Sequence, residues 1–357
     1  MKGTIIKKVS VKPLRARLNQ PFKIATGAHN ELENVLLEIE LANGVKGFGE
    51  AAPAAHITGE TQAATLANLK EAARFLPGSD AASFMHISCA VKERYPDNAC
   101  ARTAVEMALL DAVTRSAGIP LWKMFGPSCV PLNIDMTVVL GSVEEAGLDA
   151  RNIYKRGIRA FKIKIGNDPE TDFQRVLAVA KVAGKCPVYL DANQGFNSDT
   201  MLAFLKKLKG KGVVPAFVEQ PVAKDDWDGL KRVTRLGGVC VGADESVTCL
   251  ADVVRVIREK AAHAVNIKTA KFGLLEGAEM ARVASAAGLK LMAGGMMESL
   301  LSMGASAHMA AGMGCFNFID LDTPLFVRDR VMKGNILRPH GEYDLSKVRA
   351  GIGVVPA

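Results

Sequence analysis

After residue 130 the sequence alternates between short apolar runs and longer amphipathic stretches, and this alternation constrains the fold most. The apolar runs end at intervals of about 26 residues, which is the length of one strand, one helix and two loops. The ends of these runs lie near Thr137, Lys164, Asp191, Glu219, Asp244, Lys268, Gly294 and Asp320. Eight consecutive units of this length predict an α/β fold, a (β/α)8 barrel of the TIM type.

The residues before this repeat predict a separate α+β unit. Strand-like runs cover residues 5–18 and 35–49, and helical patterns cover about residues 60–75 and 101–117. The residues after 325 are too few to form a domain and are expected to pack back on the N-terminal unit. The predicted domains are an α+β unit at 1–125, the barrel at 126–325 and a C-terminal segment at 326–357.

Composition and charge exclude several classes of protein. The chain is 49% hydrophobic and 23% charged, and no apolar run reaches the length of a membrane span, so no membrane partner is expected. Its start lacks the apolar core of a signal peptide, which predicts a cytoplasmic protein. The net charge is +8, but no basic stripe with interleaved aromatic residues predicts nucleic-acid binding. The seven scattered cysteines predict reduced thiols, and homo-oligomerisation is left open.

Charged side chains end five consecutive predicted strands, in the order Lys164, Asp191, Glu219, Asp244 and Lys268. In such a barrel the carboxyl ends of the strands carry the chemistry. Three carboxylates meeting there would repel one another unless a hard divalent cation joined them, and Mg²⁺ prefers such oxygen ligands. These motifs contain no histidine or cysteine, so zinc is not expected. The alternative is that the acids are separate loop residues paired with lysines.

Two lysines share one face of the stretch FKIKIG, because residues two apart on a strand point the same way. Lys162 and Lys164 end the second predicted strand, whereas Lys268 ends the sixth, on the opposite side of the barrel. A lysine beside a metal ion and another ammonium group has a lowered pKa and can act as a base. One lysine would remove the proton α to a metal-bound carboxylate, and the other would return a proton on the opposite face. This arrangement predicts epimerisation or racemisation.

Six stretches together resemble the enolase superfamily, in its muconate lactonizing enzyme subgroup, and most of all the dipeptide epimerases within it. They are FKIKIG, VYLDANQGF, AFVEQPV, VGADES, VNIKTAKFG and FIDLDTP. The similarity covers nearly the whole chain, including PFKIATG and ITGE, which resemble the loops of the capping domain in that family. The resemblance implies a Mg²⁺-dependent isomerase that moves a proton at the α-carbon of the C-terminal residue of an L,L-dipeptide.

The resemblance also implies roles for individual residues. Lys164 and Lys268 become the acid/base pair, and Lys162 would lower the pKa of Lys164. The implied Mg²⁺ ligands are Asp191, Glu219 and Asp244, with Asn193 beside them. The implied substrate contacts are Lys162, Thr137, Gly295, Met297, Asp320 and Asp322. Asp320 and Asp322 would bind the free ammonium group of the dipeptide, although they can also be read as ordinary turn acids, and Met297 as core.

One departure from the family bears on the substrate. Epimerases that act on Ala-Glu place an arginine in the first capping loop, and the aligned position here is Gly27. Lys23 lies earlier in the loop and reads as a surface lysine, so a neutral or hydrophobic second residue becomes a candidate. His29 and His56 also fall in the expected capping loops, where contact with substrate is open.

Two other functions compete with a dipeptide epimerase. An o-succinylbenzoate synthase or a muconate cycloisomerase of the same subgroup would use the same lysines and metal site. Their substrates carry no ammonium group, so Asp320 and Asp322 favour the epimerase. A non-catalytic metal-binding barrel would not need two lysine bases.

Overall fold

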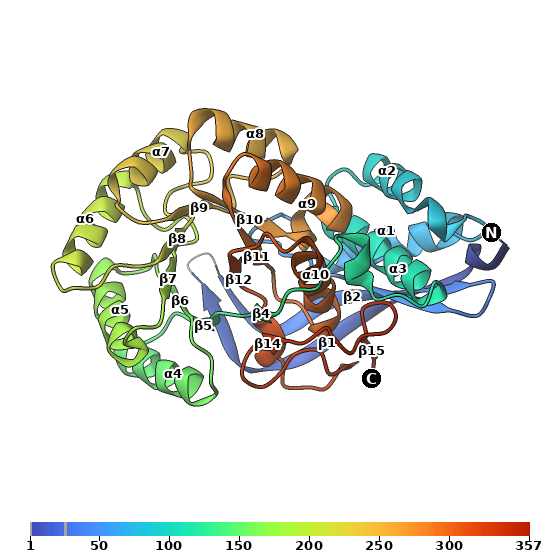
Figure 1. The fold of residues 1–357 in the computed structure, drawn as a ribbon, viewed down its shortest axis with the longest axis horizontal. Helices are drawn as coiled ribbons and strands as arrows, with labels where there is room; N and C mark the ends of the chain where they lie inside the picture. The colour runs from blue at the N-terminus through green and yellow to red at the C-terminus, as the bar shows by residue number, and fades with distance from the viewer. Residues whose placement is uncertain (1, 25–26) are drawn as a thin grey trace.

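The structure, a computed structural model, describes residues 2–24 and 27–357. Its N-terminal part is an antiparallel sheet, in the order β1-β2-β3, with helices packed against it (Figure 1). The elements are η1 (Lys2–Thr4), β1 (Ile6–Ile24), β2 (Gly27–Leu41), β3 (Lys46–Ala51), α1 (Gln62–Phe75), η2 (Ala81–Ser83), α2 (Phe84–Arg94), α3 (Ala99–Ser116) and η3 (Leu121–Met124). Helix α3 packs closely on β3, since a Cβ at Gly49 would lie 1.9 Å from the Ala104 carbonyl oxygen.

A sheet of parallel strands in the order β5 to β12 follows, with helices on its outer side (Figure 1). Its elements are β5 (Met136–Val138), α4 (Val143–Lys155), β6 (Phe161–Lys164), α5 (Pro169–Ala183), β7 (Val188–Asp191), α6 (Ser198–Lys209), β8 (Phe217–Glu219), α7 (Trp227–Leu236), β9 (Val241–Ala243), α8 (Leu250–Glu259), β10 (Ala264–Lys268), α9 (Thr269–Ala286), β11 (Lys290–Gly294), α10 (Leu300–Met313), β12 (Phe318–Ile319) and η4 (Thr323–Leu325). Asp135 N donates to Ile319 O at 2.9 Å and brings the first and last strands together. The predicted barrel is confirmed, and within the described residues η4 follows its last strand where an eighth helix would stand.

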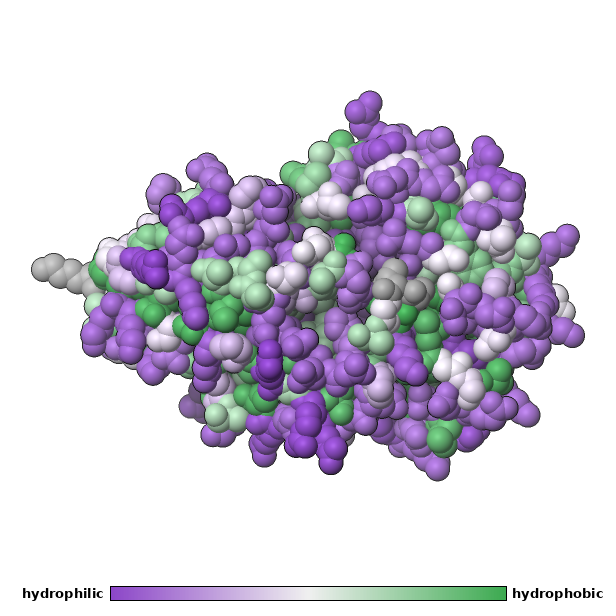
Figure 2. Space-filling view, turned by 180° about the vertical axis from the view of Figure 1, so that it is seen from behind, coloured by the Kyte–Doolittle hydropathy of each residue, from purple (hydrophilic) through white to green (hydrophobic). Residues whose placement is uncertain are grey.

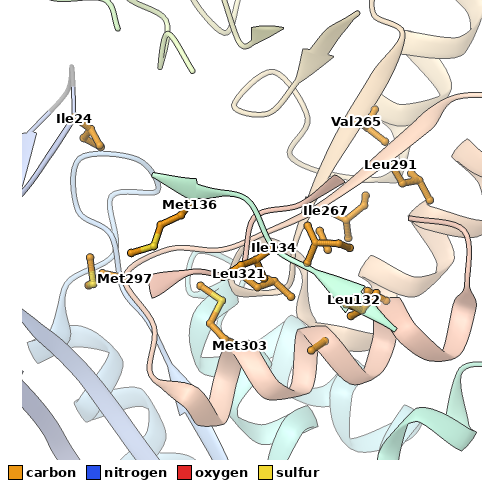
Figure 3. Close-up of a cluster of buried hydrophobic side chains, with 14 of the residues drawn as sticks. Ile24, Leu132, Ile134, Met136, Val265, Ile267, Leu291, Met297, Met303 and Leu321 are labelled. Carbon is orange, nitrogen blue, oxygen red and sulfur yellow. The ribbon is translucent and has the colours of Figure 1, made fainter. Parts of the chain in front are cut away.

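Apolar side chains fill the space between the barrel strands and the surrounding helices, and also the base of the barrel interior. Ile163 of β6 belongs to the same buried cluster as Val176 of α5, so the apolar face of FKIKIG packs against the helices. Other parts of this cluster, from β5, β10, β11 and the loop after β11, are drawn in Figure 3. Tyr189, Phe217 and Phe318 form a second buried cluster, with ring centroids 4.5 to 6.2 Å apart. Each of these rings lies two residues before a strand-end carboxylate, so it faces the interior of the barrel below that carboxylate.

The long β1–β2 hairpin reaches from the N-terminal sheet to the barrel (Figure 1). At the barrel end, Leu140 N donates to Lys23 O at 3.2 Å. Strand β1 continues through Ile24, and β2 starts at Gly27. The stretch PFKIATG, expected as a loop, is therefore mostly strand, because pairing such as Phe22 with His29 extends the ladder. Residues 25 and 26 lie outside the described part of the chain.

The C-terminal segment contacts both preceding parts. Its strands are β13 (Met332–Lys333), β14 (Glu342–Tyr343) and β15 (Val355–Pro356), and β14 pairs with β4 (Leu132–Asn133). Arg17 of β1 forms an ion pair with Asp329 at 2.8 Å, and Leu121 N donates to Gly351 O at 2.9 Å. These contacts agree with a segment that packs back on the N-terminal unit, while the division into three domains stays a prediction.

Two further expectations concern the chain as a whole. In the described part of the protein, no helix is both long and apolar enough to cross a membrane. All seven cysteines are free thiols, as the sequence predicted. Hydrophilic side chains cover most of the face drawn in Figure 2, and the apolar residues on it are scattered.

Candidate active site

The three acids predicted as metal ligands lie at neighbouring strand ends. Asp191 ends β7 and Glu219 ends β8, and the two residues are register partners. Asp244 comes one residue after β9, the next strand in the sheet. All three side chains are fully buried, so the parallel strands carry three carboxylates into the interior of the protein.

Lysine ammonium groups lie between these carboxylates. Lys162 Nζ is 2.9 Å from Asp191 Oδ2 and 2.7 Å from Glu219 Oε2. Lys164 Nζ donates to Asp191 Oδ2 at 2.6 Å. On the other side, Lys268 Nζ lies 2.5 Å from Asp244 Oδ2 and 3.9 Å from Glu219 Oε1. The predicted bases therefore flank the acids from β6 and from β10.

The lysine pKa values differ from the sequence-based expectation. Burial lowers the pKa of Lys162. The negative charges of Asp191, Asp320 and Glu219 together raise it by more, so the pKa lies well above its usual value. Burial also lowers the pKa of Lys268, but the charges of Asp244 and Glu219 together outweigh burial and raise this pKa above its usual value. Lys162 therefore stays positively charged among these carboxylates, and its role as a second positive charge beside Lys164 stays a prediction.

The donor set fits a hard divalent cation. It consists of carboxylate oxygens alone, and the buried Glu219 Oε2 has an ion-pair contact with Lys162 Nζ at 2.7 Å but no well-aligned hydrogen bond. Burial and the adjacent Asp191 raise the pKa of Glu219 to about 8, by more than Lys162 and Lys268 lower it, so a further positive charge would stabilise the ionised carboxylate. Among the described residues, no three acidic, histidine or cysteine side chains already surround a common point as metal ligands. The ammonium groups of Lys162 and Lys268 lie among the oxygens that a cation would bind.

Asp320 and Asp322 follow β12 and face the same interior. Asp320 Oδ2 accepts a hydrogen bond from Lys162 Nζ at 2.6 Å, and Asp322 Oδ2 accepts one from Thr137 N at 2.7 Å. Burial and the charge of Asp320 raise the pKa of Asp322 to about 6. Of the two, Asp320 already holds a positive group, the ammonium of Lys162.

A pocket opens above these side chains. The predicted residues that line it are Thr137, Lys164, Lys268, Gly295, Met297, Asp320 and Asp322, with Asn193. Lys162 lies beneath it, only 1% exposed. Gly295 leaves no room for a side chain, because a Cβ there would lie 2.2 Å from Met303 Cε; Figure 3 shows Met297 and Met303 near this loop. Met297 belongs to the hydrophobic core and also lines the pocket, so a core position and a contact with substrate are compatible for it.

The N-terminal hairpin and the loop after β3 supply an apolar wall to this pocket. Phe22, Ile24 and Ile57 line it, and none of them was singled out in the sequence. His29 also lines the pocket, and its ring centroid lies 4.9 Å from that of His56. Burial, with a smaller effect of His56, lowers the pKa of His29 to about 4, which keeps this imidazole neutral at neutral pH. Lys23 borders a separate hollow with Gly27.

Sequence reasoning missed two charged residues beside the acids. Lys271 Nζ donates to Asp244 O at 2.6 Å and to Asp244 Oδ1 at 3.0 Å. Glu245 Oε1 accepts from Asn193 Nδ2 at 3.3 Å, and burial raises the pKa of Glu245 to about 7. Lys271 follows Lys268 by one helical turn in KTAKFG, and this spacing was the available indication.

Comparison with known proteins agrees with this site. Residues 6–126 match the mandelate racemase/muconate lactonizing enzyme N-terminal domain, and residues 145–357 match the enolase C-terminal domain-like family. The chain belongs to the mandelate racemase/muconate lactonizing enzyme family. The resemblance found in the sequence is thereby confirmed.

Relatives within this family are similar over nearly their whole length. A hydrophobic dipeptide epimerase of Citrifermentans bemidjiense is 47% identical, over 96% of this chain and 95% of its own. An aromatic dipeptide epimerase of Herpetosiphon aurantiacus is 40% identical, over 98% of this chain and 99% of its own. The crystal structure of a dipeptide epimerase from Enterococcus faecalis, complexed with Mg and L-Leu-L-Tyr, is 27% identical and superposes with a TM-score of 0.94 over 98% of this chain and 99% of its own. These relatives confirm the predicted enzyme class, an isomerase of the racemase and epimerase type.

Proposed function

We propose that this protein is a Mg²⁺-dependent dipeptide epimerase that uses two lysine bases. The observation that carries the proposal is that Lys164 and Lys268 line the same pocket from β6 and β10, with the buried acids between them. Two amines on opposite sides of one carbon can remove a proton from one face and deliver a proton to the other. A single base would not invert the centre in this way.

Lys164 and Lys268 hold and move the proton in the proposed reaction. Asp191, Glu219 and Asp244 would hold the metal ion, which supplies positive charge that stabilises an enediolate. A cation bound to these carboxylates would offset part of their negative charge. Because that negative charge now raises the pKa of Lys268, the pKa would then fall. The pocket walls exclude water from the carbanionic carbon, which limits exchange with solvent.

Asp320 and Asp322 would bind the α-ammonium group of the dipeptide. Both line the pocket, and Asp320 already accepts a hydrogen bond from one ammonium group, that of Lys162. This supports an epimerase over an o-succinylbenzoate synthase or a cycloisomerase, whose substrates have no such group. It also argues against a barrel that only binds metal.

The second residue of the dipeptide is proposed to be apolar. Phe22, Ile24 and Ile57 line the pocket, and within its described lining the only cationic groups are Lys164 and Lys268. A glutamate side chain against this wall would lose its hydration without gaining a partner. Two relatives are named for hydrophobic and aromatic dipeptides, which supports the same assignment.

A library of L,L-dipeptides incubated in D2O tests the function. With Mg²⁺ present, we expect deuterium at the α-carbon of the C-terminal residue and formation of the L,D product, detected by mass spectrometry and by chiral analysis. Chelation of the metal should stop both. No incorporation for any dipeptide would show that the proposal is wrong.

A further inference from the structure

Two buried carboxylates of the N-terminal unit reach the backbone of the barrel. Glu50 of β3 and Glu106 of α3 are both 0% exposed. Glu106 accepts from a backbone N–H group, and Glu50 from two, in segments that follow strands of the candidate active site. Neither residue lines the pocket, so neither belongs to the site described above.

Glu106 binds the start of the regular part of α9. Its Oε2 accepts from Leu275 N at 3.1 Å, and its Oε1 accepts from the Ser88 hydroxyl. The helix is broken at Gly273, where φ is +80°, and a Cβ there would lie 2.4 Å from Glu106 Oε2. The carboxylate thus occupies the space next to a glycine and caps the helix turn that restarts after it.

Two neighbours of Glu106 on α3 hold the same segment. Thr103 Oγ1 donates to Thr269 O at 2.7 Å, and Arg102 Nη2 donates to Phe272 O at 2.5 Å. The backbone from Thr269 to Leu275 is therefore fixed at successive points by one helix of the N-terminal unit. Lys268 is the residue immediately before this segment.

Glu50 binds the start of α10 in the same manner. Its Oε1 accepts from Ser299 N at 2.9 Å and from Asn34 Nδ2 at 2.6 Å, and its Oε2 accepts from Ser302 N at 3.3 Å and from the Ser299 hydroxyl. Asn34 Nδ2 also donates to Met297 O at 2.9 Å. The loop held in this way carries Gly295 and Met297 into the pocket.

We propose that Glu106 and Glu50 are positioning residues, of which Glu106 fixes the backbone that carries Lys268 and Glu50 fixes the loop that carries Gly295 and Met297. A buried carboxylate that accepts several N–H groups resists displacement, because each amide left unpaired costs the full penalty of its desolvation. The N-terminal unit would thereby align a proton-transfer group and a substrate-binding loop separately. The kinetic consequences rest on the proposed epimerase function, whereas the positioning itself does not.

Hydrogen–deuterium exchange of the backbone amides tests the positioning directly. We expect Glu106→Ala to speed exchange about tenfold or more in residues 269–277 and not in 297–303, and Glu50→Ala to do the reverse. Asp111→Asn is the matched control: Asp111 is a third buried carboxylate, and it accepts from Phe48 N at 3.0 Å and Ile352 N at 2.8 Å, away from the pocket. If both alanine variants loosen both segments equally, or neither segment responds, the inference is wrong.

Kinetics on the dipeptide found by the library screen give a second readout. Glu106→Ala should lower kcat about tenfold or more with little change in KM, because a misplaced base slows proton transfer. Glu50→Ala should mainly raise KM. Glu106→Gln should restore activity, since an amide can accept from Leu275 N and donate to the Ser88 oxygen, whereas Glu50→Gln should not, since both Glu50 oxygens accept from backbone N–H groups. If both alanine variants changed kcat and KM in the same way, and Glu106→Gln restored no activity, the separate roles of Glu106 and Glu50 would be contradicted.

Milder variants keep the test usable if an alanine variant does not fold. Thr103→Val removes the contact with Thr269 O, and Asn34→Ala removes the contact with Met297 O. Each should speed amide exchange only in its own segment, 269–277 or 297–303. If the wild-type enzyme were inactive on every dipeptide, the proposed function would be wrong. Hydrogen–deuterium exchange would still show whether Glu106 and Glu50 position their segments.

Discussion

Lys162 Nζ lies 2.6 Å from Asp320 Oδ2, although 158 residues separate them in the chain. The pair joins β6 to the segment after β12 across the interior of the barrel. Asp320 thus holds an ammonium group of the protein at the place where the ammonium group of the dipeptide is proposed to bind. The substrate must share this carboxylate with Lys162, which links substrate binding to the charge balance around Asp191 and Glu219.

The first prediction concerns recognition of the substrate ammonium group by Asp320. Asp320→Asn should weaken binding of a free dipeptide about tenfold to hundredfold, because a hydrogen bond between charged groups is lost. Calorimetric titration of L-Ala-L-Leu and its N-acetyl derivative checks this. The wild type should prefer the free dipeptide and the variant should not; an unchanged preference would place the ammonium site elsewhere.

The second prediction concerns the metal ion. Glu219→Gln should weaken Mg²⁺ binding at least tenfold, since one of three negative ligands becomes neutral. In the wild type, Mg²⁺ affinity should rise with pH up to about 8, because the pKa of Glu219 is raised to about 8 and the ligand must lose its proton. Titration calorimetry at several pH values measures both effects, with Asp111→Asn as the control. Equal affinities in the variant and the wild type would remove Glu219 from the metal site.

The third prediction concerns the apolar wall of the pocket. We expect kcat/KM for L-Ala-L-Leu or L-Ala-L-Phe to exceed that for L-Ala-L-Glu about tenfold or more, since burial of a large apolar side chain contributes roughly 1.5–3 kcal/mol. Ile57→Ala should reduce kcat/KM more for L-Ala-L-Phe than for L-Ala-L-Ala, because Ile57 lines the wall. A preference for glutamate in the wild type would contradict the assignment.

The fourth prediction concerns stability and pH. His308 of α10 is fully buried; its Nδ1 accepts from Trp122 N and its Nε2 contacts Ile352 O, each at 3.0 Å, which together fit the neutral ring with the proton on Nε2. Burial lowers the pKa of His308 to about 4, against about 6.5 in an unfolded chain. Between these values the unfolded chain binds the extra proton, so stability is complete above pH 6.5 and falls as the pH drops toward 4, by about 3 kcal/mol in total.

Denaturant unfolding of the wild type and His308→Gln between pH 4 and 7 measures this contribution. The amide of glutamine can accept from Trp122 N and donate to Ile352 O without titrating. The difference in the free energy of unfolding between the two proteins should therefore shrink or reverse as the pH falls. A difference independent of pH would show that His308 does not titrate on unfolding.

The strand ends could be predicted because the repeat of the barrel shows in the sequence as short apolar runs that end about 26 residues apart. Asp191, Glu219 and Lys268 end their strands as expected, and Asp244 and Asp320 come one residue later. The chain continues in the strand direction for at least one residue beyond the end of β9 and of β12. The side chains of Asp244 and Asp320 therefore still point into the barrel, as the other strand-end residues do. The helix pattern from residue 101 to 117 corresponds to α3, whereas α2 was not expected, and of its residues only Ile87, Ser88 and Val91 are buried.

The contacts between distant residues could not be predicted. The charge balance of Lys162 depends on Asp320, and the position of Lys268 depends on Glu106 through Gly273, which local sequence does not reveal. The charge environment of Lys162 could not be predicted for a related reason: the neighbouring lysine is visible in FKIKIG, whereas the three carboxylates around Lys162 come from other strands. The apolar wall was missed because β1 and β2 extend beyond the expected loop.

The stereochemistry of α-proton exchange tests the two-base mechanism most directly. Lys164→Ala and Lys268→Ala should each lower epimerisation about a thousandfold, because one proton transfer is lost in each. In D2O, one variant should still exchange the α-proton of the L,L-dipeptide only, and the other that of the L,D-dipeptide only, as read by proton NMR. Exchange of the same epimer by both variants, or full turnover in either, would contradict the mechanism.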